Sequence, residues 1–149
     1  MVKLPPDFKE FLSLLHTHHV EYLLVGGYAV AAHGYPRFTG DIDLWIQTST
    51  ENSERVLQVC REFGFDVPSL TAELFKDPNQ MTRMGNPPLR IEILNSVSGL
   101  TFDAAWENRI VKQWDGVPVS LISLHDLRTN KQASGRLKDL ADLENLPNV

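Results

Sequence analysis

Two aspartates, Asp41 and Asp43, lie two residues apart in the otherwise apolar stretch 41–46. Alternate residues of a β-strand project from the same face, so the two carboxylates point together while Ile42 and Leu44 enter a core. Converging carboxylates repel each other unless a cation lies between them. Hard divalent ions such as magnesium prefer oxygen ligands of this kind, together with the phosphates of a substrate. The stretch therefore predicts a site for metal and phosphate chemistry.

A third carboxylate, Glu92, lies in the alternating stretch 89–94. Ile91 and Ile93 share one face of the expected strand, and Glu92 projects from the other. A hairpin or meander could place this strand beside residues 41–46 and bring three acids around one point. Alternation alone also fits an ordinary solvent-facing glutamate. The aspartate pair upstream favours the interpretation as a site.

Candidate phosphate-binding groups surround these acids in the sequence. Gly26 and Gly27 follow an apolar strand and precede a short helix, so backbone N–H groups are free to approach a phosphate. A bare glycine pair also fits a plain strand-to-helix turn. Lys131 lies near Arg136 and Lys138 at the junction of the last two helices. This cationic cluster is either a solvated face or a group that neutralises a triphosphate.

Hydrophobic periodicity and turn residues predict the elements that position these groups. The expected fold class is α+β (α/β), a small mixed sheet with helices packed on it and a helical C-terminus. In the last helix, leucines 137, 140 and 143 are expected to form the buried stripe. The expected helices run from the Pro5-Pro6-Asp7 start to about His19 and over 28–33, 51–63, 71–75, 102–108, 124–134 and 136–146, and the expected strands are 20–25, 41–46, 80–84, 89–94, 110–114 and 117–121.

Length and composition indicate a single domain over 1–149, with 14 basic and 19 acidic residues and a net charge of -5. This acidity argues against a surface that wraps duplex nucleic acid.

The sequence shows neither a signal peptide nor a membrane span, so we expect a cytoplasmic protein. Cys60 is expected to be a buried structural thiol. His16 and His19 could share a helix face as metal ligands, but solvated residues at a helix C-terminus are the simpler interpretation.

The segments Leu24-Val25-Gly26-Gly27, 37–44 and 90–93 together resemble the signature of the nucleotidyltransferase superfamily, whose fold is shared with DNA polymerase β. Lys131 followed by 135–143 looks like the C-terminal motif of the abortive-infection and toxin–antitoxin branch, near small bacterial nucleotidyltransferase-like proteins. The resemblance covers residues 20–146, with 66–84 unmatched. It implies a catalytic core over about 20–122 and a helical segment over about 123–147.

The resemblance implies a role for each matched residue. Asp41, Asp43 and Glu92 would be catalytic and would bind Mg²⁺ or Mn²⁺. The residues implied to bind the nucleotide are Gly26, Gly27, Arg37, Thr39, Lys131 and Asp139. Two positions depart from the common pattern, since many relatives have serine at position 27 and aspartate at position 92.

The implied function is metal-dependent transfer of a nucleoside monophosphate from a triphosphate such as ATP to a hydroxyl group, with release of pyrophosphate. The acceptor could be a tRNA, a protein or a small molecule. The alternative is a nucleotidyltransferase-like antitoxin or nucleotide-binding module that binds a cognate toxin or antitoxin partner.

Overall fold

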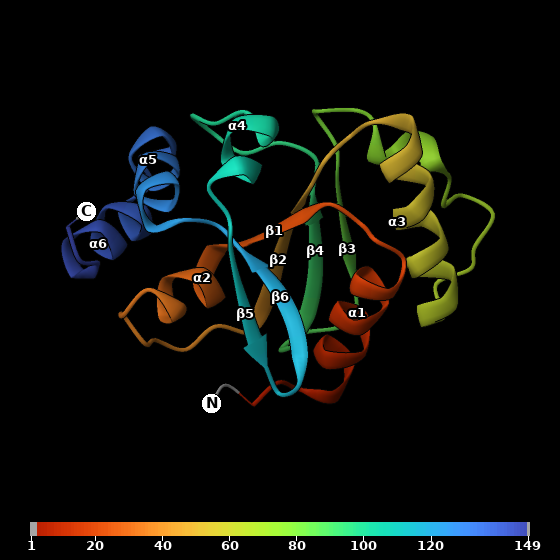
Figure 1. Cartoon of the computed structure of the whole chain (residues 1–149), viewed down its shortest axis with the longest axis horizontal. Helices are drawn as coiled ribbons and strands as arrows, with labels where there is room; N and C mark the ends of the chain where they lie inside the picture. The colour runs from red at the N-terminus through yellow and green to blue at the C-terminus, as the bar shows by residue number, and fades with distance from the viewer. Residues whose placement is uncertain (1–2, 149) are drawn as a thin grey trace.

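The computed structural model describes residues 3–148 as a mixed sheet with helices around it (Figure 1). Helices α5 and α6 lie at one end of the view and α3 at the other. The helices are α1 (Pro6–Thr17), α2 (Gly26–Ala32), α3 (Thr50–Phe63), the 3₁₀ helix η1 (Ala72–Phe75), α4 (Phe102–Glu107), α5 (Leu124–Ser134) and α6 (Leu137–Asn145), and the strands are β1 (Tyr22–Val25), β2 (Asp41–Ile46), β3 (Met81–Met84), β4 (Arg90–Leu94), β5 (Ile110–Trp114) and β6 (Val117–Leu121).

The six strands are arranged in the order β3-β4-β2-β1-β6-β5. β2 is central and pairs antiparallel with β1 and parallel with β4. The β2–β4 register places Asp41 opposite Arg90 and Asp43 opposite Glu92. The outer pairs β3–β4 and β5–β6 are antiparallel. The predicted mixed sheet is therefore confirmed, and its two acidic strands are direct neighbours.

The two faces of β2 have different surroundings. Ile42 and Leu44 are buried in a hydrophobic core that includes Phe8 of α1. On the opposite face, Trp45 packs edge-to-face against Phe102 of α4, with ring centroids 5.2 Å apart. Asp41 and Asp43 share that face with Trp45. α4 thus covers one end of this face, and the aspartates lie at the other end.

The expected connection between the acidic strands is wrong in one respect. β4 pairs with β3 in a hairpin, but it lies parallel to β2, so a long crossover through α3, η1 and β3 separates the two acidic strands. Parallel neighbours require such a crossover, whereas a hairpin or meander produces antiparallel neighbours. The carboxylates nevertheless meet, because register rather than strand direction places Asp43 opposite Glu92.

The start of α2 also differs from the expectation. The helix begins at Gly26, so the glycine pair forms its first turn instead of preceding it. Gly26 has a φ of 69°. This left-handed conformation is costly for residues with a Cβ atom and allows the chain to turn directly from β1 into α2.

The predicted buried leucine stripe of α6 is wrong. Leu137 is 87% exposed and Leu140 is exposed as well, whereas Asp139 and Asp142 are buried. The buried face of this helix is therefore acidic, and it packs against Lys131 of α5 and Arg37.

Several local features match short-range patterns in the sequence, and the predicted burial of Cys60 is confirmed. Asp115 and Gly116 both have positive φ and form the β5–β6 turn, as expected for this dipeptide. Ser49 and Ser123 cap α3 and α5 by accepting hydrogen bonds from backbone N–H groups. Cys60 is buried, and burial raises the pKa of its thiol to about 12. Among residues 3–148, no helix combines the length and apolarity needed to cross a membrane.

Candidate active site

Three carboxylates border a cleft of about 560 Å³ between the sheet and the C-terminal helices. Asp41 and Asp43 come from β2 and Glu92 from β4. Each alternates with buried aliphatic residues, which fix the direction in which the acids project. The cleft also contains five basic side chains, and its lining residues are Val25, Gly26, Asp41, Asp43, Met81, Arg83, Arg90, Glu92, Leu94, Ser96, Val97, Ser98, Asn130, Lys131, Ser134, Arg136 and Lys138.

Asp43 is the least compensated of the three acids. Burial, hydrogen bonding with Glu92 and the negative charges of Glu92 and Asp41 raise its pKa to about 7, with partial relief from Lys138. Its Oδ1 atom is buried and has no hydrogen-bond partner within residues 3–148. A buried carboxylate oxygen without a donor is costly. This side chain therefore lies where a proton or a cation would be most stabilising.

The two outer acids have arginine partners. Arg90 donates to both oxygens of Asp41, at 3.3 Å from Nε and 3.2 Å from Nη2. Arg83 donates from Nε to Glu92 Oε1 at 2.9 Å. Within the described chain, no three His, Cys, Asp or Glu side chains are grouped closely enough to hold a metal ion. The structure thus places Asp43 beside Glu92 but directs the outer carboxylates toward guanidinium groups.

A magnesium or manganese ion fits the chemistry of this site. All three acids supply the oxygen ligands that these hard cations take, and the orphaned Oδ1 atom of Asp43 lacks a counter-charge. Asp43 and Glu92 are already neighbours in register.

Gly26 determines the space beside Asp43. A Cβ atom at position 26 would lie 2.0 Å from Asp43 Oδ2, far inside van der Waals contact. The carboxylate therefore packs directly on the glycine backbone. Gly27 has a similar relation to Thr39, whose Oγ1 would lie 2.7 Å from an added Cβ.

We expect Gly26→Ala to destabilise the folded chain by about 1–3 kcal/mol more than Gly116→Ala. Both glycines have positive φ, 69° and 79°, so both variants carry the backbone penalty of about 1–2 kcal/mol. An added Cβ at Gly116 meets no atom within 4 Å, whereas at Gly26 it displaces Asp43. Urea unfolding of the two variants measures the difference, and equal losses would contradict the predicted overlap.

A buried ion cluster joins α5, α6 and the loop before β2. Lys131 Nζ lies 3.0 Å from Asp139 Oδ1 and 3.1 Å from Asp142 Oδ2. Arg37 binds both oxygens of Asp142, and Arg136 binds Asp139. Burial raises the pKa values of the two aspartates, but hydrogen bonds from Arg136, Ser134 and Lys131 to Asp139, and from Arg37 and Lys131 to Asp142, outweigh it and keep both below the usual range.

The predicted phosphate-binding residues fall into two groups. Gly26 and Lys131 line the cleft. The other four, Gly27, Arg37, Thr39 and Asp139, are not among the residues that line it. Lys131 is only 3% exposed, so the solvated-face interpretation is wrong for this residue.

The four residues outside the cleft support its walls. Thr39 donates from Oγ1 to the backbone carbonyl of Asp41 at 3.1 Å. Arg37 and Asp139 belong to the ion cluster, and Gly27 packs against Thr39.

Sequence reasoning missed Arg83 and Arg90 as cleft residues. Arg90 was detectable, because it lies two residues before Glu92 and shares its face. Arg83 was not, because its position opposite Glu92 depends on the register of the β3–β4 hairpin.

Comparison with known protein families now identifies the chain. Residues 4–147 match the family described as "Nucleotidyltransferase of unknown function (DUF6036)". The chain belongs to this nucleotidyltransferase family. The match spans both the sheet and the two C-terminal helices of the chain, and the family agrees with the resemblance noted in the sequence. A search of the curated proteins returns no match.

Solved structures share the fold of this chain at low sequence identity. A protein from Thermotoga maritima assigned to the nucleotidyltransferases has 16% identity and a TM-score of 0.63, covering 96% of this chain and 94% of that one. A lincosamide antibiotic adenylyltransferase bound to lincomycin has 14% identity and a TM-score of 0.59, covering 97% of each chain. An antigenic nucleotidyltransferase-like protein from Paracoccidioides brasiliensis has 19% identity and a TM-score of 0.53, covering 95% and 76%.

Proposed function

We propose that this protein transfers a nucleoside monophosphate from a nucleoside triphosphate to a hydroxyl acceptor and releases pyrophosphate. The observation that carries the proposal is the set of three carboxylates on two neighbouring strands, facing a cleft that also contains five basic side chains. Acids suit a divalent cation, and basic groups suit the phosphates that accompany it. Membership of a nucleotidyltransferase family supports the same reaction.

The acids and some of the basic groups of the cleft would each have a part in this reaction. Asp41, Asp43 and Glu92 would hold Mg²⁺ or Mn²⁺, which supplies charge stabilisation at the phosphates. Arg136 and Lys138 border the same cleft and would help to neutralise the triphosphate, while Lys131 is held by Asp139 and Asp142. The acceptor oxygen forms a bond to the α-phosphorus as the bond to the β-phosphate oxygen breaks. A carboxylate oxygen of Glu92 would accept the hydroxyl proton, and pyrophosphate leaves with the bonding electrons.

The acceptor is the least constrained part of the proposal. A net charge of -5 is unfavourable for a large RNA, because phosphates would be repelled outside the cleft. Lincomycin is bound by the adenylyltransferase of similar fold, so lincosamides are reasonable first small molecules to test. The screen should include tRNA and proteins beside them.

Label transfer tests the proposal directly. Purified protein is incubated with magnesium and each α-³²P-labelled nucleoside triphosphate, with and without tRNA, cell extract or lincomycin. The matched control is the Asp41→Asn/Asp43→Asn variant, which retains the side-chain shapes. We expect transfer by the natural protein and a loss of at least about 10³-fold in the variant. Transfer that persists in the variant would contradict a carboxylate-bound metal.

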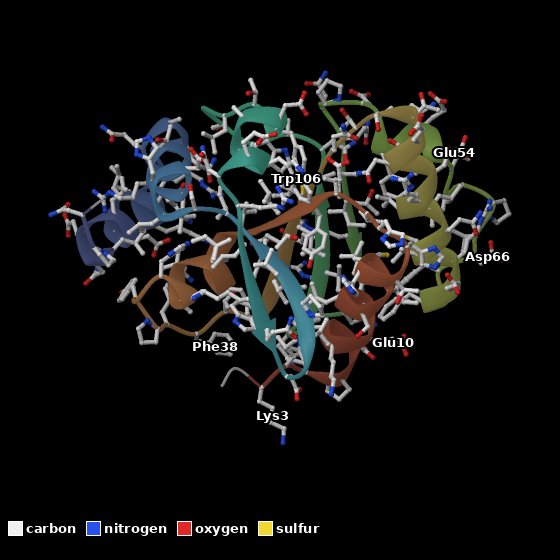
Figure 2. The ribbon with its side chains drawn as sticks, in the orientation of Figure 1. Lys3, Glu10, Phe38, Glu54, Asp66 and Trp106 are labelled. Carbon is white, nitrogen blue, oxygen red and sulfur yellow. The ribbon has the colours of Figure 1, made fainter. Side chains whose placement is uncertain are left out.

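A second candidate is a nucleotide-binding module that acts by holding a partner, such as a cognate toxin or antitoxin. It is favoured by two large apolar side chains on the surface, Phe38 at 85% exposed and Leu137 at 87% (Figure 2 labels Phe38). Thermal stabilisation by nucleotide and magnesium without any transfer would favour this candidate over the enzyme.

A further inference from the structure

The arginine contacts of the outer acids need an explanation, because they occupy the oxygens that a metal would require. Arg90 forms a two-point contact with Asp41, and Arg83 binds Glu92. Both arginines line the same cleft as the acids. Each is also a register neighbour of its partner, Arg90 opposite Asp41 and Arg83 opposite Glu92. The sheet therefore holds both guanidinium groups next to the carboxylates.

The exposure of these side chains indicates that the contacts can exchange. The side chain of Arg83 is 56% exposed while that of Glu92 is 13% exposed, so the flexible partner is the arginine. Arg90 and Asp41 are each about one-third exposed, at 30% and 29%. Ion pairs that remain in contact with water contribute only about 0–1 kcal/mol. A divalent cation that approaches the same oxygens can therefore displace the guanidinium groups.

A displaced arginine has a second partner available in a nucleotidyltransferase. The guanidinium fork matches two oxygens of a phosphate as well as it matches a carboxylate. Both arginines would remain in the cleft that receives the triphosphate, since their backbones are fixed in β3 and β4.

We propose that Arg83 and Arg90 are exchangeable counter-ions: they bind Glu92 and Asp41 when the carboxylates lack a metal, and they bind the nucleotide phosphates when a metal is present. This inference rests on the proposed function and adds two nucleotide-binding residues to it. It requires that metal and nucleotide favour each other's binding. The metal occupies the carboxylates and frees the arginines for the phosphates, and the phosphates hold the arginines away from the carboxylates.

Binding measurements on Arg83→Gln and Arg90→Gln test the exchange without relying on catalysis. Mn²⁺ binding alone is followed by electron paramagnetic resonance. Binding of α,β-methylene-ATP in saturating Mg²⁺ is followed by calorimetry. The matched control is Lys138→Gln, because Lys138 lines the cleft and forms no ion pair with a carboxylate within residues 3–148. Its loss changes the charge of the cleft by the same amount. Circular dichroism confirms that each variant is folded.

The two measurements should change in opposite directions. We expect each arginine variant to bind Mn²⁺ about three- to tenfold more tightly than the natural protein. The metal no longer has to displace a guanidinium group whose ion pair with the carboxylate contributes about 1 kcal/mol. The analogue should bind about tenfold more weakly, since a charge-assisted hydrogen bond is lost. Lys138→Gln should raise Mn²⁺ affinity less than either arginine variant, because it removes only a screened charge.

The other outcomes are separable. Mn²⁺ binding by the natural protein, with no gain in the arginine variants beyond that of Lys138→Gln, would overturn the exchange and leave the metal-dependent function standing. A parallel loss of both affinities would also overturn it, because the arginines would then only support the structure. Absence of Mn²⁺ binding in every variant and in the natural protein would overturn the proposed function itself.

Discussion

Replacing Lys131 with methionine is expected to lower the free energy of unfolding by about 3–5 kcal/mol, because it leaves two buried carboxylates without their shared cation. Asp139 and Asp142 are both buried and both lie within 3.1 Å of Lys131 Nζ. Methionine has a similar volume, so the loss reports the charge and not a cavity. Urea unfolding at neutral pH measures it.

The matched control is Lys76→Met. Lys76 pairs with Glu73 at 2.9 Å, but the glutamate side chain is 80% exposed. A surface pair of this kind should change stability by less than about 1 kcal/mol. Adding Asp139→Asn to Lys131→Met should recover part of the loss, because the other cation of Asp139, Arg136, is 68% exposed and can be hydrated instead. A Lys131→Met loss no larger than that of Lys76→Met would show that the cluster is not stabilising.

The cluster also has a pH signature. The pKa values of Asp139 and Asp142 are held below their usual range, so the cluster stabilises the fold above about pH 4. That contribution disappears as pH falls through the folded-state values. The penalty of Lys131→Met should therefore shrink as the pH falls below about 4, where the carboxyl groups of the unfolded chain become protonated before those of the folded protein do.

Asp43→Asn is expected to stabilise the metal-free protein while it abolishes transfer. A folded-state pKa of about 7 lies above the unfolded value of about 3.9, so the natural protein loses stability as pH rises from about 4 to about 7. Asparagine does not titrate. The variant should therefore match the natural protein near pH 4 and exceed it by about 1–3 kcal/mol at pH 8 in EDTA.

Two comparisons sharpen this test. Asp66→Asn removes a carboxylate that is largely exposed and should change stability by less than about 1 kcal/mol (Figure 2 labels Asp66). Magnesium at 100 times its dissociation constant should stabilise the natural protein by about 2.7 kcal/mol and Asp43→Asn much less. Parallel stability curves of Asp43→Asn and the natural protein between pH 4 and 8 would contradict the uncompensated state of this acid.

Local patterns in the sequence predicted most of the elements. Alternation identified β2 and β4, and Asp115-Gly116 identified the β5–β6 hairpin, because these signals depend only on neighbouring residues. Strand order was not predictable in this way. The parallel pairing of β2 with β4 depends on a crossover of many residues, for which a single sequence gives no local signal.

The C-terminal helices show why the candidate site was only partly predicted. Leucine spacing in α6 suggested an apolar face, but the same helix carries Asp139 and Asp142 three residues apart on one side. Burial of that acidic side depends on Lys131, which comes from another helix. Pairing between charges on separate elements is a tertiary property. Hydrophobic periodicity therefore selected the wrong face.

The contact between Arg37 and Asp142 has a consequence for how the protein is made. These residues are 105 positions apart, and their two hydrogen bonds of 2.9 and 3.0 Å hold the segment that leads into β2. During synthesis from the N-terminus, the sheet strands all emerge before α6 (Leu137–Asn145). The ribosome must therefore translate α6 before Arg37 finds its partner, so the loop next to Asp41 acquires its final geometry only late in biosynthesis.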